Sequence, residues 1–176
     1  MERIALQIGT VPISLFKWGL SLFALVAAPC WAFDANGVAL GAAEADVQKA
    51  FPAARCKPME WNTDAADRRC DDGPVSFGGA QARISFFLKK DAVQAFDVRF
   101  DARDLARVAA FLKSSYGAPD AEGEERIQRR RETRVLHKLR WKRGEDRAVL
   151  TSESGRRRVD LNVWRGDFDT EVYDIK

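Results

Sequence analysis

Histidine and cysteine, the side chains most specific to catalytic and metal sites, number one and three in this 176-residue chain. His137 is the only histidine, so the chain lacks an HExxH motif, a histidine-rich metal site and any mechanism that needs two histidines. A Ser-His-Asp triad would have to use His137 as its base. In a strand-like segment, however, His137 shares a face with Val135 and Leu139, and this position predicts a histidine in the core or at an interface.

The carboxylates form no motif of a known site. Asp71 and Asp72 could bind a cation weakly, but no EF-hand spacing follows them. Acidic residues occur along the whole chain, so a hydrolytic pair of carboxylates with separated pKa values stays open. The residues therefore predict no catalytic group, no metal ligand and no cofactor.

The first 32 residues have the layout of a secretory signal peptide. Basic residues at Arg3 and Lys17 precede an apolar run over Trp18–Ala28, and small residues stand before Phe33. At about 1.5 Å per residue this run is too short to cross a bilayer. We expect residues 1–32 to be removed, by a cut after Ala32 or close to it, and the protein to be periplasmic or secreted. A retained membrane anchor is the alternative.

The cysteines fit an exported protein. Cys30 would leave with the leader, and Pro29 before it is a poor match to a lipidation signal. Cys56 and Cys70 remain as an even pair, which favours a disulfide. A metal pair is the alternative, but the chain has one histidine and no CxxC spacing.

The order of elements repeats along the chain. Residues 33–100 and residues 101–176 each show one amphipathic helix followed by about three alternating strands. The helix ends lie about 65 residues apart. We therefore expect an α+β fold of two tandem repeats, with the helices on one face of an antiparallel sheet. Helices are expected at 43–51 and 102–116, with Asp101 as the N-cap of the second and Gly117 at its end. Strands are expected at 83–89, 93–100, 135–142, 147–153 and 158–164, turns at 73–74 and 78–79, and a polar loop at 120–125.

Short motifs accompany this order of elements. They are the Gly37, Leu40 and Gly41 opening, the Tyr116, Gly117 and Pro119 helix end, and Trp141 on a strand. On these residues the chain resembles the tandem helix-plus-sheet modules of the β-lactamase inhibitor protein type. It is also similar to the small lipoprotein subunit of the outer-membrane barrel assembly machinery. The resemblance implies an exported, non-enzymatic, protein-binding fold, either an inhibitor or an envelope-assembly accessory, and the cysteine pair is similar to a disulfide in the inhibitor.

Charge and strand phase suggest where a partner would bind. The net charge of +3 argues against a nucleic-acid protein, and no later apolar run is long enough for stable membrane insertion. The basic stretch Arg126–Arg143 would either steer an acidic partner or form a solvated strand face. If Leu139 points to the helices and the core, the opposite face of the sheet meets solvent. The candidate partner-binding residues on that face are Phe87, Arg99, Lys138, Arg140, Arg158 and Trp164.

We therefore expect an exported module that binds another protein. One form of this prediction gives the partner protein an acidic surface. A small envelope hydrolase that uses a carboxylate pair is the alternative. For two of the candidate residues there is also an alternative: Phe87 and Trp164 would not face solvent but would pack under the ends of loops.

Overall fold

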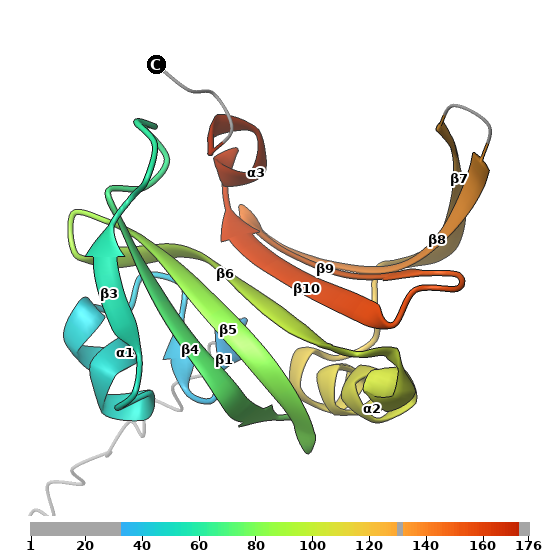
Figure 1. Ribbon diagram of the computed structural model, residues 1–176, viewed down its shortest axis with the longest axis horizontal. Helices are drawn as coiled ribbons and strands as arrows, with labels where there is room; N and C mark the ends of the chain where they lie inside the picture. Colours follow the sequence, from blue (N-terminus) through green and yellow to red (C-terminus); the bar gives the residue numbers. More distant parts are fainter. Residues whose placement is uncertain (1–32, 130–131, 173–176) are drawn as a thin grey trace, which may run out of the picture. The chain divides into compact units, whose positions relative to one another are not determined.

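The computed structural model describes residues 33–129 and 132–172, and within them the fold is α+β (Figure 1). Its main element is an antiparallel sheet of eight strands in the order β3-β4-β5-β6-β10-β9-β8-β7. A short hairpin, β1 (Asp34–Ala35) with β2 (Val38–Ala39), precedes it. The sheet strands are β3 (Arg55–Pro58), β4 (Arg68–Phe77), β5 (Ala80–Lys89), β6 (Ala92–Asp101), β7 (Ala121–Arg129), β8 (Glu132–Arg143), β9 (Asp146–Glu153) and β10 (Arg158–Arg165).

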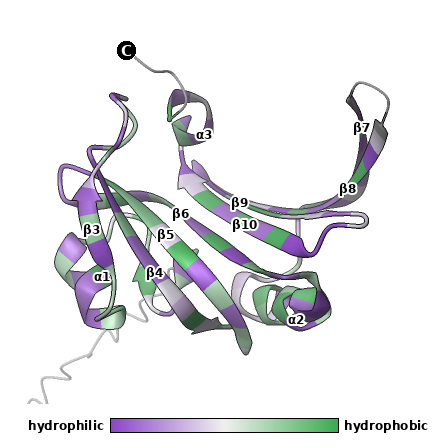
Figure 2. Cartoon of the chain, in the orientation of Figure 1, coloured by the Kyte–Doolittle hydropathy of each residue, from purple (hydrophilic) through white to green (hydrophobic). Residues whose placement is uncertain are grey.

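Period-two alternation gives the sheet two distinct faces. On β5, Ile84, Phe86 and Leu88 are buried, whereas Arg83 and Ser85 point to the other side. The same alternation of hydrophilic and hydrophobic residues runs along the neighbouring strands in Figure 2. We call the side with Phe86 the helix face and the side with Ser85 the open face.

Two helices cover the helix face. In α1 (Glu44–Ala50), Val47 is buried, and Phe51 just after the helix packs on Phe86 with ring centroids 5.1 Å apart. The sequence places acidic Glu44 in the first turn, where it suits the helix dipole and also pairs with Arg68 of β4 at 2.7 Å. Pro52 follows and cannot continue the helix.

The second helix, α2 (Leu105–Tyr116), ends before Gly117 as predicted, but it begins three residues later than expected because a 3-10 turn follows the predicted cap Asp101. Asp101 caps the short 3-10 turn η1 (Ala102–Asp104) before it, accepting a hydrogen bond from the backbone N–H of Arg103 at 3.0 Å. Gly117 ends the helix at φ +83°, a conformation that a Cβ would disfavour. Val108, Leu112 and Tyr116 form its buried stripe.

Tyr116 joins three distant segments of the chain. Its hydroxyl donates to the carbonyl of Asp34 at 2.6 Å, and burial raises its pKa. Its ring lies 4.9 Å from that of Phe33 and 6.0 Å, edge-on, from that of Trp141. Trp141 in turn donates from Nε1 to the carbonyl of Gly117 at 2.9 Å. The beginning of the described chain, α2 and β8 are therefore fixed together.

A third helix, α3 (Phe168–Glu171), lies on the open face. Phe168 packs on Phe87 of β5 with ring centroids 5.5 Å apart. The loop after β3 holds the end of α3, because Trp61 Nε1 donates to the carbonyl of Val172 and Thr63 Oγ1 to that of Glu171, both at 2.8 Å. This helix was not predicted, since the segment carries only one apolar turn.

Three local expectations were wrong. The loop expected at 120–125 is part of strand β7, which lies at the sheet edge; its side chains are exposed and carry no apolar signal. The turn expected at Gly73-Pro74 lies inside β4, where the register shifts between Asp72 and Val75. Four strands, not about three, follow each of α1 and α2.

The leader prediction falls on residues 1–32, outside the described residues. Phe33, the expected first residue of the mature protein, is fully buried. None of the described helices is long and apolar enough to cross a membrane.

Candidate functional site

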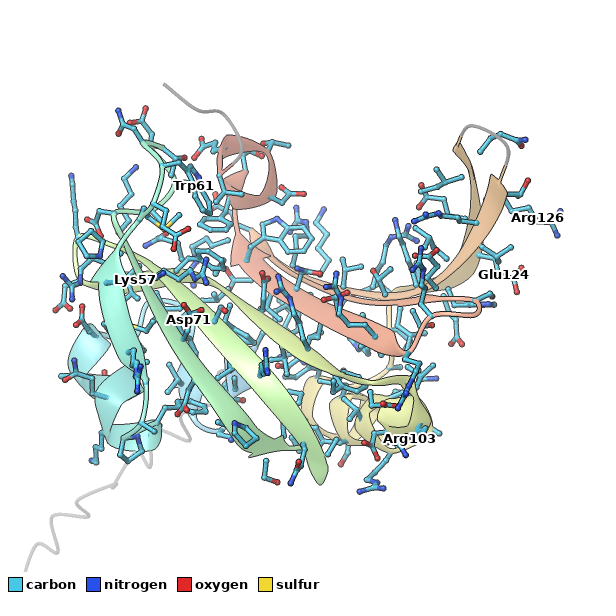
Figure 3. The ribbon with its side chains drawn as sticks, viewed as in Figure 1. Lys57, Trp61, Asp71, Arg103, Glu124 and Arg126 are labelled. Atoms are coloured by element: carbon cyan, nitrogen blue, oxygen red, sulfur yellow. A yellow bond between two sulfur atoms is a disulfide. The ribbon has the colours of Figure 1, made fainter. Side chains whose placement is uncertain are left out.

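The candidate site is a hollow of about 680 Å³ on the open face, which we call the open-face hollow. It lies over the middle strands β6, β10, β9 and β8, and α3 closes one end. Figure 3 shows side chains from these strands pointing into the space between Trp61 and the β7–β8 hairpin. Concave sites that bind ligands commonly have a volume in this range.

Strand pairing arranges the open face in three cross-strand rows, because residues in register lie side by side. The aromatic row is Phe87, Ala95, Trp164, Arg147 and Lys142. The central row is Asp71, Ser85, Asp97, Asn162, Val149 and Arg140. The outer row is Arg83, Arg99, Asp160, Thr151 and Lys138.

The apolar end of the hollow is built from aromatic side chains. Phe87 and Trp164 flank the small Ala95, and Phe168 fills the space that Ala95 leaves. Phe87 is 9 % exposed and Trp164 is partly buried. The expectation that both face solvent is therefore wrong for Phe87 and only partly right for Trp164, because α3 covers them. Trp61, which was not among the candidate partner-binding residues, also lines this end of the hollow.

The other end of the aromatic row is basic. Arg147 and Lys142 are directly opposite each other on β9 and β8. Neither side chain forms an ion pair with any residue that the structure describes. Arg147 donates to the carbonyl of Gly144 at 2.7 Å, and Asp120 accepts from the backbone N–H of Lys142 at 2.6 Å.

Lys138 and Arg140 share one carboxylate. Lys138 hydrogen-bonds to Glu125 of β7, which lowers the pKa of that carboxyl, and Arg140 lies 3.6 Å from the same group. Their side chains point to the open face, as the alternation predicts. Both line the open-face hollow.

Two carboxyls of the central row have pKa values shifted in opposite directions. Burial raises the pKa of Asp97, whose Oδ1 accepts a hydrogen bond from Asn162 at 2.8 Å. Burial also opposes ionisation of Asp71, but hydrogen bonds from Arg69 at 2.8 Å and Ser85 at 2.6 Å outweigh it and lower the pKa. Ser85 stands between the two acids in register.

Five of the six candidate partner-binding residues line the open-face hollow, and Arg158 does not. Arg158 pairs with Asp160 at 3.2 Å, beside Arg99, and lines a second hollow of about 1120 Å³. The two hollows share Arg69, Asp97 and Arg99, so they adjoin. Alternation alone could have indicated Asp97, Arg147 and Asn162, which our candidate set missed.

The basic stretch Arg126–Arg143 is divided between the two faces of the β7–β8 hairpin. His137 is exposed, and its Nδ1 lies 3.3 Å from Glu124, so of the predicted core or interface position the core is wrong and the interface stays a prediction. Arg126 belongs to the same face as Glu124 and points away from the hollow (Figure 3). Hydrophobic neighbours at this distal end of β8 are too few to bury a ring.

The predicted disulfide is confirmed. Cys56 and Cys70 are directly opposite in the β3–β4 ladder and are bonded. In the part of the chain that the structure describes, Glu44 and these cysteines are the one set of potential ligands close enough to hold a metal. Because the sulfur atoms are bonded to each other, the set offers no thiolate pair to an ion.

No known family model matches this chain, and no curated protein matches it. Among solved structures, it is similar to the crystal structure of a DUF4309 family protein (YjgB) from Bacillus subtilis subsp. subtilis str. 168. The two share 14 % identity over 73 % of this chain and 82 % of that chain, with a TM-score of 0.35.

Proposed function

We propose that this protein is an exported module that binds another protein on the open face of its sheet. The observation that carries the proposal is the open-face hollow, which gathers tryptophan and arginine on the side of the sheet away from α1 and α2. These residue types dominate the binding energy of protein interfaces. Export is supported by the leader-like residues 1–32 and by the Cys56–Cys70 disulfide.

We also propose that residues 33–100 and 101–176 are tandem repeats. In support, the first contains α1 and the second contains α2, each followed by a four-strand antiparallel meander, and the last strands, β6 and β10, pair with each other. The resemblance to the β-lactamase inhibitor protein type implies such a layout. An inhibitor of an exported enzyme or an envelope-assembly accessory fits this proposal.

Site-directed photocrosslinking tests the binding face. A benzoylphenylalanine at Thr151, in the middle of the open face, is expected to give a discrete crosslinked species in cell-envelope fractions of the source organism. The matched control is the same residue at Ala110, exposed on α2. Equal products from both positions, or products from Ala110 alone, would contradict binding on the open face.

A second candidate function, an envelope hydrolase, is favoured by one observation. Asp71 and Asp97 flank Ser85 on an open face, and their pKa values are moved apart, as a general acid and its partner require. Turnover of ester or cell-wall substrates that is lost in Asp97→Asn would support the hydrolase. Unchanged crosslinking from Thr151 in that variant supports the binding module.

Asp97→Asn also has a predicted effect on stability. The folded protein holds the Asp97 proton to a higher pH than the unfolded chain does, despite the nearby cations Arg69 and Arg99. Ionisation therefore costs native stability as the pH rises above the ordinary aspartate range. We expect Asp97→Asn to melt at a higher temperature than the wild type at pH 7 and at the same temperature at pH 3, as measured by circular dichroism. A lower melting temperature at pH 7 would show that the ionised form is stabilised.

A further inference from the structure

We propose that the aromatic row binds one extended segment of the partner protein, with an aspartate or glutamate of that segment between Arg147 and Lys142. A large apolar side chain next to this acid would lie against Trp164. This inference rests on the proposed protein-binding function and names the chemistry that the open face recognises.

Two cationic side chains, Arg147 and Lys142, lie directly opposite each other at one end of the aromatic row. Like charges directly opposite each other in a sheet are destabilising. Arg147 and Lys142 are held in this register by the β8–β9 ladder, and no described carboxylate forms an ion pair with either side chain, since the nearby Asp120 accepts from the backbone N–H of Lys142. A carboxylate from outside would relieve the repulsion and accept charge-assisted hydrogen bonds from both side chains.

Trp164 is directly opposite Arg147 on β10, so an apolar surface begins one strand away from the cations. Trp61, Phe168 and Val172 extend this surface around Trp164. Adjacent strands are about 4.8 Å apart, and side chains of adjacent residues in a peptide can reach both parts of the row.

The open face carries acidic as well as basic side chains, and this mixture indicates the class of ligand. Asp97 and Asp160 lie between the arginines of the open face, so a uniformly anionic surface, such as a membrane or a nucleic acid, would be repelled. The open-face hollow also adjoins the second hollow, so the groove extends past the size of a small ligand. A mixed groove of this length fits a protein segment with acidic, apolar and hydrogen-bonding side chains.

Selection from a phage library of random 12-residue peptides tests this inference on the purified protein. The expected result is enrichment of peptides with an aspartate or glutamate within two residues of a tryptophan, phenylalanine or leucine. The best peptide, made synthetically, should bind the double variant Arg147→Gln, Lys142→Gln at least tenfold more weakly, and should bind Trp164→Ala similarly weakly. Replacing its acid by the amide should cause a similar loss on the wild type and no further loss on the double variant.

The control separates binding from folding. Arg126→Gln removes a cation from the opposite face of β7 and should leave peptide affinity unchanged. The double variant should melt close to the wild-type temperature, because the removed like-charge repulsion offsets the hydrogen bonds that Arg147 donates to the carbonyls of Gly144 and Asp146. A lower melting temperature would give Arg147 and Lys142 a structural role and overturn the inference.

Other outcomes of the peptide selection would contradict the inferred binding of an acidic, apolar segment. Enriched peptides without an acid would overturn the inference and leave the proposed function standing, as would full affinity in the double variant. Failure to enrich any peptide, together with binding to phosphatidylglycerol vesicles, would replace the protein segment by a lipid. Failure of the Thr151 crosslink is a separate result, and it counts against the proposed function itself.

Discussion

Trp141→Ala is expected to lower the free energy of unfolding by about 3–5 kcal/mol, the usual cost of truncating a large buried side chain. Trp141 is 2 % exposed, stacks edge-on against Tyr116, and donates to the carbonyl of Gly117. Its loss leaves a cavity between α2 and β8 and an unpaired carbonyl. Urea denaturation followed by circular dichroism measures the change.

The effect should extend to binding. Arg140 and Lys142 flank Trp141 in sequence and point to the open face, so loosening β8 misplaces both cations. Leu139→Ala and Trp164→Ala are controls on the helix face and the open face. Both should cost less stability than Trp141→Ala, because Leu139 and Trp164 are only partly buried. A Trp141→Ala protein as stable as the Leu139→Ala protein would contradict the packing of β8 on α2.

Removing the disulfide is the second large effect. Cys56 and Cys70 are separated by 14 positions, and closing a loop of this size contributes about 3 kcal/mol in the chain-entropy model. The double variant Cys56→Ala, Cys70→Ala should lose this amount in urea denaturation, without burying a new hydroxyl in place of Cys70. Reduction of the wild type with dithiothreitol should reproduce the loss.

The disulfide also bears on the site. The loop that contains Trp61 follows β3, and β3 is an edge strand whose one neighbour is β4. Freed from the bond, β3 and Trp61 should move more, and peptide affinity should fall in the double variant. Two free thiols in the unfolded, non-reduced protein would show that the disulfide does not form. A melting temperature that does not change on reduction would show that the disulfide adds little stability.

Alternation along the strands could be read without a structure. The alternation predicted that Leu139 and Val163 lie on one face of the sheet and that Arg140 and Trp164 lie on the other. The pairing of β8, β9 and β10 agrees with this prediction. The physical reason is that side-chain direction along a strand depends on backbone geometry alone. Helix α2 and the turn at Gly78-Gly79 were predictable for a similar reason, because caps and positive-φ glycines act locally.

The elements that lack an apolar signal could not be predicted. Every described side chain of strand β7 is exposed, including its one large apolar residue Ile127, and only the hydrogen bonds to β8 make the segment a strand. Helix α3 is held by Phe87 and by the loop around Trp61, which lies more than 100 residues earlier. Such segments gain their structure from partners far away in the chain, and periodicity carries no information about distant partners.

The residue types and faces of the candidate site were set by the amino-acid sequence, through local alternation. Their neighbours were set by strand order and register. Pairing of β6 with β10 brings Asp97 beside Asn162, and pairing of β8 with β9 places Lys142 opposite Arg147. Packing of α3 buries Phe87, which alternation alone assigned to solvent. These contacts are non-local, so they follow from the free energy of the whole packed sheet and not from any one segment.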